Sequence, residues 1–461
     1  MKIGLLPLGR PTFDVEFAQD NLASMLDALE QTGHEFEGSR DLLFDADATG
    51  QATNELAAAE IDRLLILQVT FTDAVMTKRA ALSVDCPVLI WAIPEPRIGG
   101  RLRLNSFCGL NLASHALGLI GRRPLWHYAA PGNTSAEELT DWLEKDRPAD
   151  PPAASETASQ DLAAGQAVLK AITGKSIARL GDHPDGFDTC AYDRETLKSL
   201  TGISVDALEL QKLFDTASNV SPEAVEPVRS QAQRDVGGLD AVDAEQLDRS
   251  LRLKVALDDI ASGGGYDAFA IRCWPETFTE YGGAVCGPVA MLGEKRTPCA
   301  CEADVYGAVS QLILQQVADD SVFLVDLVDM DRADGTGVVW HCGQAPVSMR
   351  DPDAEPKATI HTNRKMPLLY EFPLKPGPVT LMRLSQAQGE TKIVLAKGEM
   401  QRRPMAFTGT SGVLTFDNGV AQVLDSVIES GLEHHMALAY GDHVAHVKSV
   451  AAALQLPVLE L

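Results

Sequence analysis

The chain has 461 residues, 45% of them hydrophobic, and a formal net charge of −26 at pH 7. This length exceeds a single ordinary core and the hydrophobic share excludes a disordered chain, so we expect two or three folded domains. The acidic charge repels nucleic acid and anionic membrane surfaces, so neither is expected as a partner.

The first 145 residues alternate short apolar runs with amphipathic stretches. The runs are typical of buried parallel strands and the stretches are typical of helices. The strands are predicted over residues 2–6, 63–67 and 87–91, and the helices over 17–30, 73–83 and 110–120. This alternation predicts an N-terminal α/β domain, residues 1–145, in which helices cover a parallel sheet.

Residues 146–160 are rich in proline and small polar residues, which predicts a linker. A second α/β domain is expected over residues 161–330. Its strands are predicted over 176–180, 203–210, 268–271 and 322–325, and its helices over 244–262 and 303–317. The run of three glycines at 263–265 ends the first of these helices, because glycine readily adopts left-handed backbone angles.

After about residue 330 the chain changes to short β-like runs separated by glycine, proline and aspartate. These runs cover 338–340, 368–372, 379–384 and 392–396, and a helix over 443–454 and a strand over 457–461 follow. They predict a β-rich, barrel-like C-terminal domain, residues 331–461. The predicted fold class is therefore α/β, with two parallel-sheet α/β domains followed by a β-rich domain.

The lack of a visible targeting signal and the scattered cysteines lead us to expect a cytoplasmic enzyme. The N-terminus has no basic region followed by an apolar stretch, and no apolar run approaches the roughly 20 residues that span a bilayer. The eight cysteines are scattered, which favours reduced thiols over a disulfide framework. Cys299 and Cys301 form a CxC pair without a second pair at zinc-like spacing, so a zinc site is not favoured there.

Carboxylates and imidazoles occur where the strands of the second half are predicted to end. Glu302 precedes a predicted helix, where a carboxylate meets the positive end of the helix dipole. Asp326 interrupts an apolar strand, where a buried charge needs a partner or a metal. His341 ends the next strand, and His435 lies in a polar insertion near the C-terminus. Because open α/β sheets place ligands at the carboxyl ends of their strands, these four residues form a candidate metal site.

Each of these residues also has a structural interpretation. Glu302 could be an ordinary carboxylate at a helix N-terminus, and Asp326 could be a salt-bridge partner in the core. A single histidine, such as His341 or His435, is commonly a hydrogen-bonded structural residue. Only the combination of two carboxylates with two imidazoles indicates a metal, and a carboxylate-rich set favours Mn²⁺ or Mg²⁺.

The first domain holds a second group of candidates. Arg97, Arg101 and Arg103 lie in a glycine-containing segment of this acidic chain, which suggests a loop that binds an anionic or polyhydroxylated substrate. The alternative is a surface charge cluster or salt bridges between subunits. Gln68 and Thr70 follow a predicted strand, where a ligand-facing loop is expected, although the segment could also serve only to cap the next helix.

Motifs of other enzyme classes are missing from the sequence. It contains no GxGxxG dinucleotide motif, no GxxxxGK[ST] phosphate loop and no GxSxG nucleophile elbow.

The sequence resembles the L-fucose/L-arabinose isomerase superfamily, and its fucose isomerase-like branch most closely. The segments that carry the resemblance are RCWPE at 272–276, CEADV at 301–305, FLVD at 323–326, PGPVTLMRL at 376–384 and the HHxALxYG run at 434–441. The resemblance covers the whole chain and is more specific from residue 272 onward.

The resemblance implies roles for particular residues. Glu302 and Asp326 lie 24 residues apart, which is similar to the spacing of the metal-binding Glu and Asp of the family. His435 matches the C-terminal metal histidine of the family, and His341 matches a histidine that arabinose isomerases use. Arg272 and Trp274, in the RCWPE segment, are candidates for substrate binding together with the residues of the first domain.

The resemblance further implies three domains and a homo-oligomer, in which the first domain of one subunit completes the active site of a neighbour. The predicted function is a metal-dependent aldose–ketose isomerase that acts on a pentose, a hexose or an anionic sugar derivative through a cis-enediol. Glu302 and Asp326 are the candidates for proton transfer, and Mn²⁺ is the first candidate metal, with Mg²⁺ and Co²⁺ as alternatives. The chain is shorter than typical members, so the sugar stays open.

Two other functions agree with the same pattern. One is a non-catalytic sugar-binding or sensor protein, because two α/β domains with a cleft also describe such proteins. The other is a metal-dependent epimerase or lyase that acts on a sugar acid.

Overall fold

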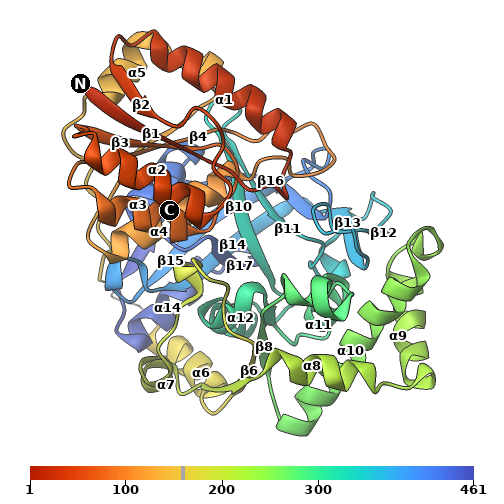
Figure 1. The fold of residues 1–461 in the computed structure, drawn as a ribbon. Helices are drawn as coiled ribbons and strands as arrows, with labels where there is room; N and C mark the ends of the chain where they lie inside the picture. Colours follow the sequence, from red (N-terminus) through yellow and green to blue (C-terminus); the bar gives the residue numbers. More distant parts are fainter. Residues whose placement is uncertain (157–160) are drawn as a thin grey trace.

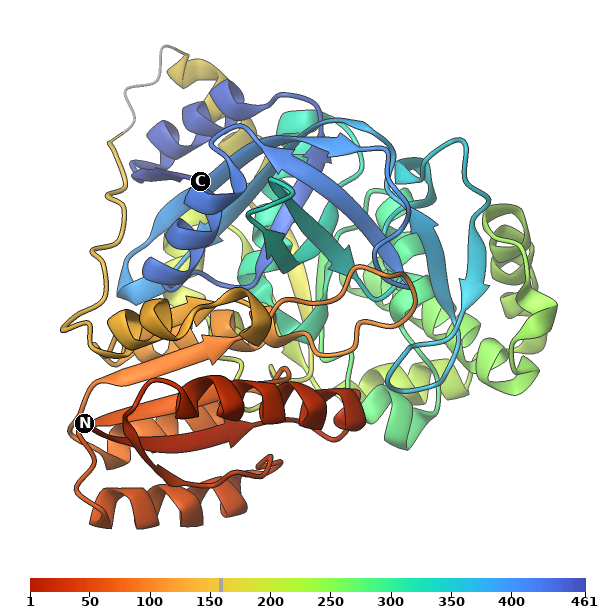
Figure 2. The ribbon, with the colours of Figure 1, turned by 90° about the horizontal axis from the view of Figure 1, so that it is seen from above.

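The computed structural model describes residues 1–156 and 161–461. It contains a five-stranded sheet, a four-stranded sheet and a nine-stranded sheet. Figure 2 shows the first domain, in red to orange, as a separate layer against the rest of the molecule. The predicted fold class is confirmed, with two parallel-sheet α/β domains followed by a large β-rich one.

The first sheet is parallel and has the order β2-β1-β3-β4-β5. Alternate residues of its central strand β3 belong to two different cores, Leu65 and Leu67 to one and Leu64 and Ile66 to the other, so helices cover both faces. Its strands are β1 (Lys2–Leu8), β2 (Glu35–Gly38), β3 (Arg63–Gln68), β4 (Val88–Ala92) and β5 (Leu125–Tyr128). Its helices are α1 (Val15–Glu30), α2 (Ala46–Ala58), α3 (Ala74–Ser83), α4 (Ser106–Leu119) and α5 (Ala136–Leu143).

The second sheet is also parallel and has the order β7-β6-β8-β9. Its strands are β6 (Ser176–Leu180), β7 (Ser204–Leu208), β8 (Ala268–Ile271) and β9 (Cys299–Ala300). Its helices are α6 (Leu162–Ile172), α7 (Arg194–Thr201), α8 (Leu210–Ser218), α9 (Pro222–Asp235), α10 (Ala244–Gly264), α11 (Cys286–Glu294) and α12 (Val305–Ala318). Figure 1 shows α8, α9 and α10 at one side of the molecule, away from the first domain.

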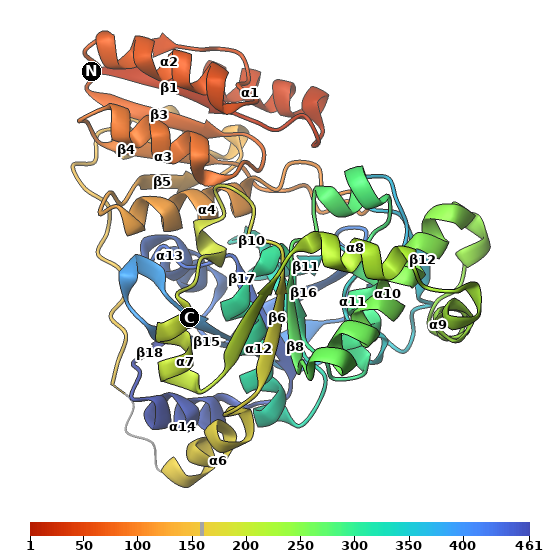
Figure 3. The same ribbon diagram turned by 60° about the horizontal axis from the view of Figure 1, so that its bottom comes forward.

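In both parallel sheets the strand order reverses at one point. In the first sheet β2 and β3 flank β1, and in the second β7 and β8 flank β6. The loops that follow β1 and β3 therefore diverge, and so do the loops that follow β6 and β8. Such a point is where doubly wound sheets bind ligands. Figure 3 shows both sheets together with the third domain.

The third sheet is mixed and has the order β12-β13-β16-β11-β10-β17-β14-β15-β18. An additional pairing of β15 with β16 closes the strands from β16 to β15 into a ring, which agrees with the expected barrel. The strands are β10 (Phe323–Asp331), β11 (Thr336–His341), β12 (Lys357–Thr359), β13 (Leu369–Pro373), β14 (Gly377–Ser385), β15 (Lys392–Gln401), β16 (Thr410–Phe416), β17 (His435–Tyr440) and β18 (Val458–Glu460). The helices α13 (Val420–Glu429) and α14 (Val444–Leu454) complete this domain.

The structure differs from the sequence-based expectation in two ways that affect the site. Strand β10 was predicted as the last strand of the second domain, but it pairs with β11 and β17 in the third sheet. The segment expected to be a polar insertion contains β17, which is buried at His435 and Met436. Both differences bring the candidate residues of the second and third domains onto neighbouring strands.

Helix α4 joins the first domain to the third. It is buried from Ser106 to Leu117 because it packs against the first sheet on one side and against β10 and α13 on the other. Asn111 Nδ2 donates a 2.6 Å hydrogen bond to the carbonyl of Leu432, just before the two adjacent histidines.

Of the predicted linker 146–160, Ser155 forms an isolated bridge with Val458, and residues 157–160 lie outside the described residues. In the parts of the chain that the structure describes, no helix is both long enough and apolar enough to cross a membrane.

Candidate active site

The pairing register of two strands brings Asp326 and His435 together. Strands β10 and β17 are antiparallel, and Asp326 lies directly opposite His435, so the two side chains share one face of the sheet. His435 Nε2 lies 3.3 Å from Asp326 Oδ1. Among the described residues, this buried oxygen has no hydrogen-bond partner. An unpaired buried carboxylate oxygen needs a cation or a donor, which marks it as a ligand position.

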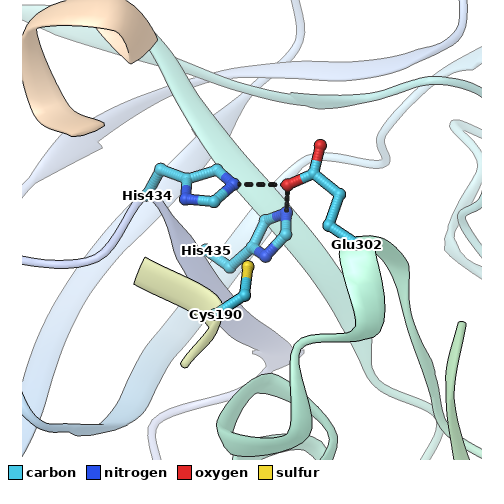
Figure 4. Close-up of side chains that lie close together, drawn as sticks. All are labelled: Cys190, Glu302, His434 and His435. Atoms are coloured by element: carbon cyan, nitrogen blue, oxygen red, sulfur yellow. Dashed lines mark hydrogen bonds and ion pairs between the residues drawn. The ribbon is translucent and has the colours of Figure 1, made fainter. Parts of the chain in front are cut away.

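Glu302 reaches the same point from the turn that precedes α12. Glu302 and Ala303 have left-handed backbone angles, with φ of 57° and 54°, and this conformation turns the chain just before the helix. Glu302 Oε2 lies 3.8 Å from His435 Nε2 and 2.9 Å from His434 Nε2 (Figure 4). The Glu302 side chain is 14% exposed.

Hydrogen bonds hold Glu302 in its ionised form. Burial alone would raise its pKa, but the hydrogen bond and the positive charge of His434 outweigh this effect and lower the pKa. Trp274 Nε1 donates a 3.0 Å hydrogen bond to the other carboxylate oxygen, Oε1. Both oxygens of Glu302 therefore accept from fixed donors, and the carboxylate stays charged at neutral pH.

A buried ion pair behind His435 sets the orientation of its ring. Asp304 Oδ2 lies 2.9 Å from His435 Nδ1, and Asp304 also pairs with Arg383 at 2.7 Å and 3.1 Å. Burial alone would raise the pKa of Asp304, but the charge of Arg383 and then His435 hold it well below its usual range. A carboxylate at Nδ1 keeps the proton on that nitrogen, so the lone pair of Nε2 points towards Asp326 and Glu302.

His341 presents the opposite ring nitrogen. The backbone N–H of Cys342 donates a 2.9 Å hydrogen bond to His341 Nδ1. A nitrogen that accepts a hydrogen bond carries no proton, so neutral His341 carries its proton on Nε2. Nε2 is buried and has no hydrogen-bond partner among the described residues. The side chains of Asp326, His341 and His435 lie within 4.8 Å of one another, so His341 stays a candidate ligand; with its proton on Nε2 it would act as a hydrogen-bond donor instead.

A divalent cation fits this arrangement. Glu302 and Asp326 offer carboxylate oxygens, and His435 offers a lone pair that Asp304 orients, which is a donor set suited to Mn²⁺ and similar metals. The unpaired Asp326 Oδ1 is the buried atom that such a cation would satisfy. The Cys190 sulfur lies near Glu302, His434 and His435 (Figure 4), but burial raises the pKa of its thiol well above the usual value, so it stays neutral.

The two histidines are expected to differ in their effect on metal affinity. His435→Ala should weaken Mn²⁺ binding by about 10–100-fold or more. A loss of that size is typical even when the residue removed only hydrogen-bonds to a metal ligand. His341→Ala should weaken it much less, because its Nε2 carries a proton. Calorimetric titration of Mn²⁺ into both metal-free variants measures the difference, and equal, undiminished affinity in both would remove the imidazoles from the site.

Of the predicted substrate-binding residues, Trp274 lies beside the candidate metal ligands through its bond to Glu302. Arg272 Nε donates to Glu276, and Arg272 Nη1 donates to two backbone carbonyls, so its guanidinium is largely engaged. Gln68 Nε2 donates to the carbonyl of Thr70, and Thr70 Oγ1 accepts from the backbone N–H of Arg10. Gln68 and Thr70 therefore shape the loop that carries Arg10.

The structure separates the three arginines of the first domain. Arg97 binds Asp329 and Thr336 and lines a separate cleft of about 1550 Å³. Arg103 binds Asp14 and stacks on a phenylalanine ring. Arg101 contacts a backbone carbonyl and Asn363 at 3.3 Å and 3.4 Å, and its buried Nε has no partner among the described residues. Arg101 is therefore the member of the trio with a buried donor that has no partner among the described residues.

Several residues near the site were not predicted from sequence. Asp304, Arg383 and His434 lie within the segments that carry the family resemblance. Asp304 is close to Glu302 and His434 directly precedes His435, so the same segments could have indicated these residues. Arg10 and Arg364 lie in loops without a recognisable pattern, and only their contacts with Trp274 reveal them.

Comparisons with known proteins match this chain along its whole length. Residues 4–145 match the N-terminal domain of fucose/sulfoquinovose isomerases, and residues 339–461 match the C-terminal domain of L-fucose isomerase. A sulfoquinovose isomerase of Clostridium sp. (strain MSTE9) is 30% identical over 461 residues, which cover 99% of this chain and 98% of that protein. A sulfoquinovose isomerase of Priestia megaterium is 28% identical over 453 residues, which cover 98% and 97%.

Proposed function

Because the chain belongs to the fucose/sulfoquinovose isomerase family and is an aldose–ketose isomerase, we propose that it converts a sulfonated aldohexose into the corresponding ketose with the help of one divalent metal ion. The relatives at 28% and 30% identity carry the name sulfoquinovose isomerase and share nearly the full length of the chain. Sulfoquinovose, a glucose whose carbon 6 carries a sulfonate, is accordingly our first candidate substrate.

The observation that supports a metal is the convergence of Glu302, Asp326 and His435 on one point, with an unpaired buried oxygen of Asp326. These three residues would hold the cation, and Mn²⁺ remains our first candidate, with Mg²⁺ and Co²⁺ as alternatives. When bound, the metal would polarise the carbonyl of the open-chain sugar as a Lewis acid.

The residues of the chain supply the proton transfer. One carboxylate, of Glu302 or Asp326, removes the proton from carbon 2 of the open-chain sugar, and oxygen 1 gains a proton, which gives a cis-enediol. The carboxylate returns its proton at carbon 1 while the hydroxyl on carbon 2 loses its proton, so that the net hydroxyl proton moves from oxygen 2 to oxygen 1 and the ketose results. His434 and Trp274 keep Glu302 charged and oriented, while the Nε2–H of His341 is free to donate to a sugar oxygen. Within one chain, the first domain already brings Phe71 near this site, through its ring contact with Phe187.

Two further parts of the proposal concern assembly and location. We propose that the protein forms a homo-oligomer, in which a neighbouring subunit completes the site, and that it is cytoplasmic. Size measurement by light scattering tests the first.

Incubation with sulfoquinovose in deuterated water tests the reaction. We expect the 6-sulfonated ketose as product, with deuterium at carbon 1, because the base exchanges its proton with solvent before it returns it. An epimerase would instead place deuterium at carbon 2 of an aldose, a lyase would cleave the chain, and a sugar-binding protein would give no product. Any of these three outcomes would overturn the proposal, and so would a preference for neutral glucose.

A further inference from the structure

Arg364 is a partly buried cation that has no carboxylate partner among the described residues. Its guanidinium lies against the ring of Trp274, with the Cζ atom 5.6 Å from the ring centre. Its backbone N–H bonds to His361, and its side chain makes no hydrogen bond or ion pair within residues 1–156 and 161–461. A cation removed from water without a partner is costly, so this position is suited to an anion from outside the chain.

Arg10 lies against the same indole ring. Its Cζ atom is 5.6 Å from the ring centre of Trp274 and 5.3 Å from that of Phe71, and one of its nitrogens pairs with Asp73. Burial, and then the positive charge of Arg10, lowers the pKa of Arg364. Two guanidinium groups that repel each other at one aromatic ring become mutually stable when an anion lies between them.

The fold places this pair where ligands bind. Arg10 follows β1, beside β3, at the point where the strand order of the first sheet reverses. Trp274 follows β8, beside β6, at the equivalent point of the second sheet. The binding points of both doubly wound sheets therefore meet at this indole ring, and Arg364 joins them from the loop between β12 and β13.

One indole ring separates the two arginines from the candidate metal ligands, since Trp274 Nε1 donates to Glu302 Oε1 at 3.0 Å. At ordinary carbon–carbon bond lengths an extended six-carbon chain is about 6 Å long, comparable with the long axis of an indole. An open-chain sugar with carbons 1 and 2 at Glu302 and Asp326 can therefore extend its carbon 6 along the ring towards the arginines.

We propose that Arg364 and Arg10 form the subsite that binds the sulfonate of the substrate and selects it over a neutral sugar. This inference rests on the proposed isomerase function and names the part of the site that determines its specificity. The planar fork of a guanidinium donates two parallel hydrogen bonds to a tetrahedral oxyanion, and the strongly acidic chain repels such an anion elsewhere.

The test compares Arg364→Gln with Arg364→Lys and with the control Arg229→Gln. Arg229 is also partly buried, at 29% exposure, but it pairs with Asp248 on the outlying helices. Calorimetry measures the Kd of sulfoquinovose and of 6-deoxyglucose in metal-loaded and in chelated protein. Arg364→Gln should raise the Kd of the sulfonated sugar about 10–100-fold and leave the neutral sugar unchanged, because one charge-assisted contact is lost. Arg364→Lys should recover part of the loss, and the control should bind as the parent chain does.

The binding readout separates this inference from the proposed function. If Arg364→Gln and Arg10→Gln both bind sulfoquinovose as the parent chain does, the subsite is refuted, even when ketose still forms. If the Kd values change as expected but no ketose forms from any sugar, the subsite stands and the isomerase proposal fails. A loss of the same size for both sugars would show that Arg364 only supports the fold, and would also overturn the inference.

Discussion

Replacement of Glu302 by glutamine, or of Asp326 by asparagine, is expected to lower kcat about 10²–10⁴-fold, the range for the loss of a general acid or base. Both changes keep the size and most of the hydrogen bonds of the side chain, but neither amide can accept a proton from carbon 2. Glu302 is the more constrained of the two, because His434 and Trp274 fix both of its oxygens. Steady-state kinetics at saturating Mn²⁺ and saturating substrate measure the effect.

Asp351→Asn provides the matched control for this prediction. Asp351 is a similarly buried aspartate, at 5% exposure against 7% for Asp326, and it pairs with Arg402 away from the site. Its kcat per folded molecule should remain within a few-fold of the parent value. A near-normal kcat in Glu302→Gln or Asp326→Asn would show that the residue concerned is structural and would leave proton transfer to the other carboxylate.

Removal of the metal should abolish turnover, and added Mn²⁺ should restore it. Without a cation, the carboxylates of Glu302 and Asp326 lie near the same imidazole nitrogen, and one buried oxygen has no partner. A cation that binds only the folded chain stabilises it, so Tm should rise with Mn²⁺ concentration. At a hundredfold excess over Kd the stabilisation is about 2.7 kcal/mol. Activity and Tm measured after chelation and after addition of Mn²⁺, Mg²⁺ or Co²⁺ give both readouts.

Two results would contradict the metal prediction. The first is full activity in a preparation that elemental analysis shows to be free of metal. The second is a Tm that rises equally with Mn²⁺ in the parent chain and in Asp326→Asn, because the cation would then bind elsewhere on this acidic protein.

The sequence predicted strands β1, β3 and β4 of the first sheet and β6, β7 and β8 of the second, for a clear physical reason, but missed the short strands β2, β5 and β9. Strands such as β3 are buried on both faces, so they consist of continuous apolar residues between turn signals. Strand β17 was not predicted, because it begins with His435, directly after a second histidine, and histidines are uncommon at the start of a buried strand. The ring of the third domain was predicted only as a class, since pairings between strands far apart in the chain leave no local signal.

The candidate site was predictable in its residues but not in its geometry. The resemblance pointed to Glu302, Asp326 and His435, yet the direct opposition of Asp326 and His435 depends on the register of β10 and β17, which lie far apart in the sequence. The roles of the arginines could not be predicted either. Arg97 stood out in the sequence and Arg364 did not, and only the structure shows that the first is surrounded by acceptors while the side chain of the second has none among the described residues.

The left-handed turn at Glu302 and Ala303 also affects the stability of the backbone at the candidate site. In L-residues other than glycine this conformation costs about 1–2 kcal/mol each. Glycine would relieve the strain at either position, but at 302 it would delete the carboxylate. Under the proposed role of Glu302 as proton acceptor, this turn is a local trade-off between backbone stability and activity. With that role, selection for turnover would preserve the turn, whereas selection for thermostability alone would act against it.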